Sequence, residues 1–86
     1  MPEFEPTGDL VTDVQSAIDY GNVVYITYTD RKGNYSERNV APLEIRGDRF
    51  YAADLGKMAL RLFVLEGVDQ YQILDDTFDK DSLLLQ

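Results

Sequence analysis

The first regular pattern along the chain is an apolar stripe with the spacing of a helix. Within residues 10–20, apolar positions recur every three to four residues, at Leu10, Val11, Val14, Ala17 and Ile18. Asp9 directly precedes the stripe and is a suitable N-cap, because its carboxylate can accept a hydrogen bond from the first helical turn. Gly21 suits the left-handed conformation that ends many helices. The pattern predicts a helix over residues 10–20.

After Gly21 the pattern changes to short, β-branched and aromatic runs separated by turn residues. The runs are residues 22–30, 35–46, 49–55, 58–66 and 68–74, and such composition is typical of strands. Pro42 has no N–H to donate to a ladder, so it marks an edge, a bulge or a bend. The order predicts a mainly β (α+β) fold, with an N-terminal helix followed by a small five-stranded SH3-like or Sm-like barrel.

The length of 86 residues allows one domain. We expect a flexible arm over residues 1–8, the barrel domain with its helix over 9–76, and a C-terminal tail over 77–86. The tail either forms a short helical turn or docks its apolar end on the barrel. The N-terminus is acidic where a signal peptide is basic, and no apolar run approaches the length of a membrane span. These features predict a cytoplasmic protein with no membrane partner.

Composition narrows the chemistry. The chain has no histidine and no cysteine, which removes the usual zinc ligands, the usual general base and any Ser-His or Cys-His pair. We therefore expect no enzyme activity, no metal and no cofactor. The net charge of −8 argues against general nucleic-acid binding, yet seven of the eight basic residues fall between residues 31 and 61. These charges either pair with acids across strands or form one basic, aromatic patch.

Several short motifs occur in the order found in the WYL domain family, a group of small bacterial and phage regulatory modules. They are a strand that ends Tyr28-Thr29-Asp30, Arg38 before Val40-Ala41-Pro42-Leu43, Phe50-Tyr51-Ala52, and Arg61-Leu62-Phe63-Val64-Leu65. The chain resembles a stand-alone WYL domain over about residues 10–80, with Phe-Tyr-Ala as a degenerate signature and Gly67 where a second Arg is frequent. The resemblance implies a barrel that senses a ligand, a nucleotide or nucleic acid, and regulates a partner protein.

The candidate ligand-binding residues are Arg38, Tyr51 and Arg61, with Arg49, Phe50 and Lys57 as additional candidates. A guanidinium can hold a phosphate with two hydrogen bonds, and a tyrosine ring can stack on a base. Each residue also has a structural interpretation. Arg61 can pair with an internal acid such as Asp54, Arg38 can pair with an acid across a strand, and Tyr51 can cap the core with its hydroxyl in water.

These residues support three hypotheses of function. The first is a non-catalytic, ligand-sensing regulatory module that binds a nucleotide or a short single strand and modulates a partner protein. The second is a protein-interaction or self-association module without a small ligand, including a homodimer, because SH3-like sheets expose edges. The third is an acidic protein that mimics nucleic acid, which the charge of −8 suggests.

Overall fold

The helix forms where the apolar stripe predicts it. The computed structural model describes residues 6–78, and its first element is α1 (Leu10–Tyr20). The Asp9 carboxylate accepts a hydrogen bond from the Thr12 N–H at 3.0 Å, which satisfies one of the free donors of the first turn. Gly21 adopts φ 74° and its N–H returns to the end of the helix. Both predicted helix ends are confirmed.

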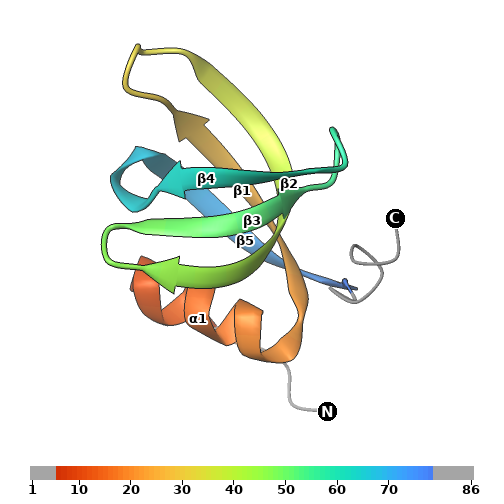
Figure 1. Cartoon of the computed structure of the whole chain (residues 1–86). Coiled ribbons are helices and arrows are strands. Elements are labelled where there is room, and N and C mark those ends of the chain that lie inside the picture. Colours follow the sequence, from red (N-terminus) through yellow and green to blue (C-terminus); the bar gives the residue numbers. More distant parts are fainter. Residues whose placement is uncertain (1–5, 79–86) are drawn as a thin grey trace.

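Five antiparallel strands follow in one sheet (Figure 1): β1 (Asn22–Thr29), β2 (Tyr35–Arg46), β3 (Arg49–Asp54), β4 (Ala59–Val64) and β5 (Val68–Thr77). Their spatial order is β4-β3-β2-β1-β5. The predicted fold class is confirmed. Several strand boundaries differ from the predicted runs. β1 ends at Thr29, β3 at Asp54 and β4 at Val64, residues 65–67 form a 3₁₀ turn, and β5 continues to Thr77, one residue into the predicted tail.

The long strand β2 curls the sheet. Its first half pairs with β1 up to the pair Val24–Val40, and its second half pairs with β3 from the pair Val40–Asp54 onward. The register shifts between Pro42 and Glu44, which confirms the irregularity predicted at Pro42. A proline gives up a ladder hydrogen bond, so the chain bends there and brings β3 and β4 over the same core as β1.

The core lies between α1 and the concave face of the sheet. Val14 and Ala17 of α1 pack in one buried cluster with residues of β1 to β4, including Ile26, Tyr28, Val40, Phe50, Ala52 and Phe63, and partly buried side chains of β5 pack against it. The Phe63 ring stacks on Phe50 and meets Tyr28 edge-on, with centroids 5.4 and 5.1 Å apart. Gly67 passes so close that a Cβ there would lie 2.7 Å from the Tyr28 ring. This position therefore excludes any side chain.

A buried carboxylate ties the N-terminal segment to the last strand. Asp13 is fully buried and accepts hydrogen bonds from the Thr7 N–H (2.9 Å), the Thr7 hydroxyl (2.9 Å), the Gly8 N–H (3.2 Å) and the Tyr71 hydroxyl. Burial raises the pKa of Asp13, but these bonds together outweigh it and hold the pKa below its usual value. Thr7 and Gly8, which the sequence places in a flexible arm, are thus bonded to α1.

The C-terminal tail falls mostly outside the described residues. Its predicted helical turn or docked apolar end concerns residues 79–86, which the structure does not describe. Phe78 is described, and its N–H donates to the Gly21 carbonyl at 2.8 Å. Within residues 6–78, no helix is long and apolar enough to cross a membrane.

Candidate functional site

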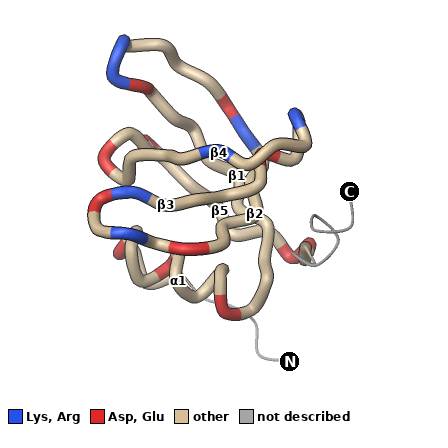
Figure 2. The backbone as a smooth tube through the Cα atoms, viewed as in Figure 1, with Lys and Arg blue, Asp and Glu red and all other residues tan. Residues whose placement is uncertain are grey.

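Charge is distributed unevenly over the fold. Figure 2 shows the basic positions on β2, β3, β4, the turns between them and the turn between β1 and β2, with some acidic positions among them, whereas α1 and β5 carry acidic positions only. The sheet therefore places the basic residues of the middle of the sequence away from the acids of both ends. This separation leaves a cationic region on an otherwise negative molecule.

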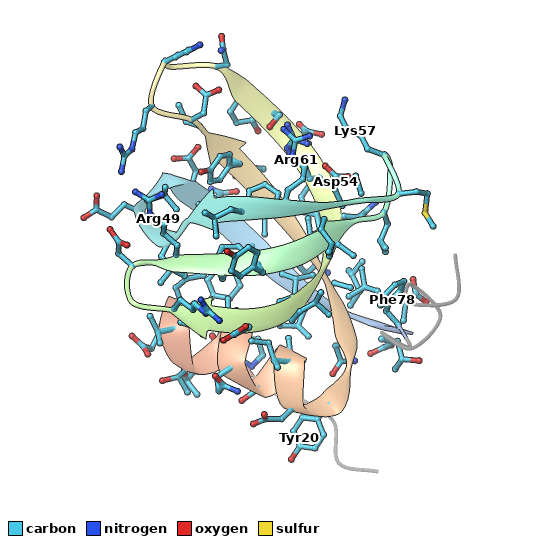
Figure 3. The ribbon with its side chains drawn as sticks, in the orientation of Figure 1. Tyr20, Arg49, Asp54, Lys57, Arg61 and Phe78 are labelled. Atoms are coloured by element: carbon cyan, nitrogen blue, oxygen red, sulfur yellow. The ribbon has the colours of Figure 1, made fainter. Side chains whose placement is uncertain are left out.

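The centre of the cationic region is a carboxylate that two arginines share. The Asp54 side chain, only 4% exposed, forms an ion pair between its Oδ2 and Nη1 of Arg38, and the same oxygen lies 4.0 Å from Nε of Arg61. The ladder explains the convergence: Asp54 pairs with Val40, two residues from Arg38, and Arg61 pairs with Ala52, two residues from Asp54. Residues two apart on a strand share a face, so all three side chains lie on the concave face. Figure 3 shows Asp54 and Arg61 close together at the upper edge of the sheet.

The second oxygen of Asp54 is also engaged. Oδ1 accepts a hydrogen bond from the Gly56 N–H at 3.1 Å and so shapes the turn between β3 and β4. One carboxylate balances only one of the two guanidinium charges, and among the described residues Arg61 makes no hydrogen bond. The cluster keeps an excess positive charge with guanidinium donors available to an anion.

The two arginines differ in exposure and in the number of their contacts. Arg38 is 19% exposed, donates from Nε to the Ser36 hydroxyl at 3.1 Å, and lies 5.8 Å from the centre of the Phe63 ring. These contacts fix its plane over the open end of the core. Arg61 is 41% exposed, and Lys57 lies in the adjacent turn (Figure 3). The cluster therefore combines a guanidinium held by several contacts with one that is more exposed.

The other sequence-predicted residues lie elsewhere. Phe50 is 1% exposed and belongs to the core, so its ring has almost no surface to offer a ligand. Tyr51 pairs with Leu62, one position from the pair Ala52–Arg61, and it therefore faces the convex side. There the Arg46 guanidinium lies 5.9 Å from its ring centre. Arg49 lies at the far end of β3, 3.6 Å from Asp48. The structure brings Arg38 and Arg61 together at Asp54, whose Oδ1 also accepts from the backbone N–H of Lys57 at 3.4 Å. It does not bring Tyr51, Phe50 or Arg49 there.

A pocket of about 280 Å³ lies in a different place, where the end of α1 meets the bend of β2. It is lined by Ile18, Asp19, Tyr20, Gly21, Asn22, Ala41, Pro42, Leu43 and Phe78. None of these residues is cationic, and Asp19 contributes a negative charge that repels an anion. We therefore place the candidate anion site at the exposed Arg38–Asp54–Arg61 cluster and not in this pocket. Among residues 6–78, no three His, Cys, Asp or Glu side chains are grouped to hold a metal ion.

Sequence reasoning missed the shared role of Asp54. It offered Asp54 as a partner of Arg61 alone, although Asp54 has the same parity as Phe50 and Ala52 and therefore belongs to the core face. That parity was the available signal. The sequence carries no signal for the hydrogen bond between Asp13 and Tyr71, because 58 positions separate the two residues and neither belongs to a motif.

Comparison with known proteins bears on the fold. No protein-family model matches the chain, and no curated protein matches it. Among solved structures, the proteasome accessory factor B/C (PafBC) of Arthrobacter aurescens is similar, with a TM-score of 0.71 and 23% sequence identity over 80% of this chain. The likeness covers 12% of that protein. It shows a shared fold and supports the WYL-like fold that the sequence motifs imply.

Proposed function

We propose that the protein is a non-catalytic regulatory module that binds a phosphate-bearing ligand, a nucleotide or a short single-stranded nucleic acid, and modulates a partner protein. Arg38 and Arg61 hold the phosphate, and Lys57 adds charge at the rim. The observation that carries the proposal is the sharing of one buried carboxylate by two guanidinium groups. The name of the structural neighbour, an accessory factor, is compatible with a regulatory role.

The arrangement suits phosphate for two reasons. A planar guanidinium donates two parallel hydrogen bonds to a phosphate, and the Arg61 side chain is 41% exposed. The ligand does not need to displace Asp54, because it meets the excess charge from the solvent side. The acidic remainder of the molecule repels long polyanions, which favours a small or short ligand over duplex nucleic acid.

A thermal-shift screen tests the proposal. The probes are inorganic phosphate, nucleoside mono-, di- and triphosphates, cyclic nucleotides and short single-stranded DNA and RNA, each at low and moderate salt. A ligand at about 100 times its dissociation constant stabilises by about 2.7 kcal/mol, which raises Tm by about 10 °C or more in a domain of this size.

The matched variants are Arg61→Ala and Arg31→Ala. Arg31 is an exposed arginine in the turn between β1 and β2 with no salt bridge among the described residues, so its removal changes the net charge equally without touching the cluster. The expected result is a shift that disappears in Arg61→Ala and persists in Arg31→Ala. No shift with any phosphate compound, or equal loss in both variants, overturns the proposal.

A further inference from the structure

The convex side of β4 carries an apolar surface that the fold leaves uncovered. Leu60 and Leu62 are 58% and 44% exposed, and they share a face with Tyr51, which is 37% exposed. Met58, in the turn that leads into β4, is exposed as well. We call Tyr51, Leu60 and Leu62 the β4 apolar face. Clustered exposed apolar side chains are characteristic of interaction surfaces, and this cluster lies on the opposite side of the sheet from Arg61.

The same strand has a free hydrogen-bonding edge. Within residues 6–78, β4 pairs with β3 only and stands last in the sheet order (Figure 1). The Val64 N–H points away from β3, because it donates to the Tyr28 hydroxyl at 2.9 Å. Backbone groups alternate sides along an antiparallel strand, so the N–H and C=O groups of Leu60 and Leu62 lie on this free side too. The edge is occupied at Val64 by the Tyr28 hydroxyl, but no strand among residues 6–78 lies beside Leu60 and Leu62, so their backbone groups can bond to another strand.

We propose that β4 docks an extended segment of a partner protein in which apolar and acidic residues alternate. The segment adds a strand beside β4 and bonds to the backbone of Leu60 and Leu62. Its apolar side chains cover the β4 apolar face. Its acidic side chains, on the other side of the strand, meet Arg61. The pattern Leu60-Arg61-Leu62 thus selects the complementary apolar-acidic-apolar pattern in the partner.

Charge argues for a different protein as the occupant and against a second copy. Two β4 strands paired about a two-fold axis bring the Arg61 side chains of both copies to one face at close range, and like charges across strands destabilise the pairing. Each copy also carries a net charge of −8, which adds repulsion. An acidic side chain on the incoming strand replaces the repulsion between two Arg61 side chains with an attraction, and it neutralises the excess positive charge of the Arg38–Asp54–Arg61 cluster.

This inference deepens the proposed function and rests on it at one point, since a partner carboxylate and a ligand phosphate use the same guanidinium of Arg61. Phosphate binding then weakens docking of the segment. The ligand would release the partner through direct competition at one residue, with no rearrangement of the fold.

The test uses a nine-residue peptide, STVEVEVTS, blocked at both ends, and its charge-reversed form, STVKVKVTS. Each is titrated into the full chain to about 1 mM, near the dissociation constant of a contact worth about 4 kcal/mol, while backbone amide NMR signals are followed. We expect the acidic peptide to shift the amides of residues 59–64 and to bind at least about tenfold more tightly than the basic one. Inorganic phosphate should weaken its binding.

Two variants keep docking separate from ligand binding. The double variant Leu60→Thr/Leu62→Thr should weaken the acidic peptide about tenfold and leave phosphate binding unchanged, while Tyr35→Thr, a matched exposed position on β2, should change neither. The docking proposal is overturned if neither peptide shifts the amide signals of residues 59–64, or if both peptides bind with equal affinity. It is also overturned if the free chain sediments as a dimer and the double variant does not. If the protein binds phosphate but neither peptide, only the docking proposal is refuted. If it binds the acidic peptide but not phosphate, only the proposed phosphate ligand is refuted.

Discussion

Replacing Asp54 by asparagine should destabilise the fold and, at the same time, strengthen phosphate binding. The Asp54 carboxylate accepts from the Gly56 N–H through one oxygen and pairs with Arg38 through the other. An asparagine amide offers only one acceptor. Whichever way the amide is oriented, its NH₂ group faces a donor, either the Gly56 N–H or the Arg38 guanidinium.

The size of the effect follows from burial. Removing one partner of a buried ion pair costs about 3–5 kcal/mol. Asp54 is buried, but the Arg38 and Arg61 side chains are 19% and 41% exposed, so water solvates part of the released charge. We expect Asp54→Asn to lower the free energy of unfolding by about 2–3 kcal/mol, just below that range. In a domain of this size, the corresponding fall in Tm is about 10–20 °C.

Urea unfolding with and without inorganic phosphate measures both effects. Glu66→Gln is the control, since Glu66 is exposed and its substitution makes the same change in net charge. Phosphate should stabilise Asp54→Asn more than the parent protein, because both guanidinium groups are then free to bind it. A loss below about 1 kcal/mol, the range of exposed pairs, refutes the argument from burial. If phosphate stabilises both proteins equally, the claim that Asp54 occupies guanidinium charge that a phosphate could otherwise bind is refuted.

Two further predictions concern the core and the N-terminal segment. Tyr71→Phe removes a hydroxyl donor from the buried Asp13 carboxylate and should cost about 1.5–3 kcal/mol in urea unfolding. The pKa of Asp13 is lowered, so the stabilisation by its carboxylate is present above pH about 3.8 and disappears as the pH falls through the folded-state pKa. The loss in unfolding free energy caused by Tyr71→Phe should therefore shrink in acid. A loss that stays constant with pH contradicts this argument. Gly67→Ala forces a Cβ to 2.7 Å from the Tyr28 ring and should lower the free energy of unfolding by about 1–3 kcal/mol. Gly56→Ala is the control and should lower it much less, because its Cβ meets the nearest atom at 3.6 Å. Equal Tm values for the two variants exclude the steric explanation.

Local pattern was enough to predict the elements of this fold. The helix has an apolar stripe, a capping aspartate and a terminal glycine within thirteen residues, so its ends depend on neighbours in sequence alone. The irregularity in β2 was predictable because proline lacks an N–H wherever it stands. The close approach of Gly67 to the Tyr28 ring was not predictable, because the two residues lie far apart in the sequence.

The candidate site was predictable only in part, for a related reason. Parity along a strand indicates which residues share a face, and it correctly separates Tyr51 from Phe50 and Ala52. Parity within one strand does not give the register between strands, and register decides which faces meet. The meeting of Arg38 with Asp54 depends on the pair Val40–Asp54 and on the bulge after Pro42. Tyr51 and Arg61 were grouped as one site because each has a suitable side chain, yet the pair Ala52–Arg61 sets them on opposite faces.

That separation gives the two faces of β3 and β4 different chemistry. On the concave face, Asp54 holds Arg38 in place and leaves Arg61 with accessible donors, so this face attracts an anion. On the convex face, Leu60 and Leu62 attract apolar groups. Arg61 stands between these leucines on an edge strand, where an incoming strand places its own alternating side chains on both faces at once. A single six-residue strand therefore joins the proposed ligand and the proposed partner through one guanidinium, and the acidic remainder of the chain limits which anions reach it. Competition at Arg61 requires only that phosphate and carboxylate both bind arginine, so the proposed regulation needs no second site and no rearrangement of the fold.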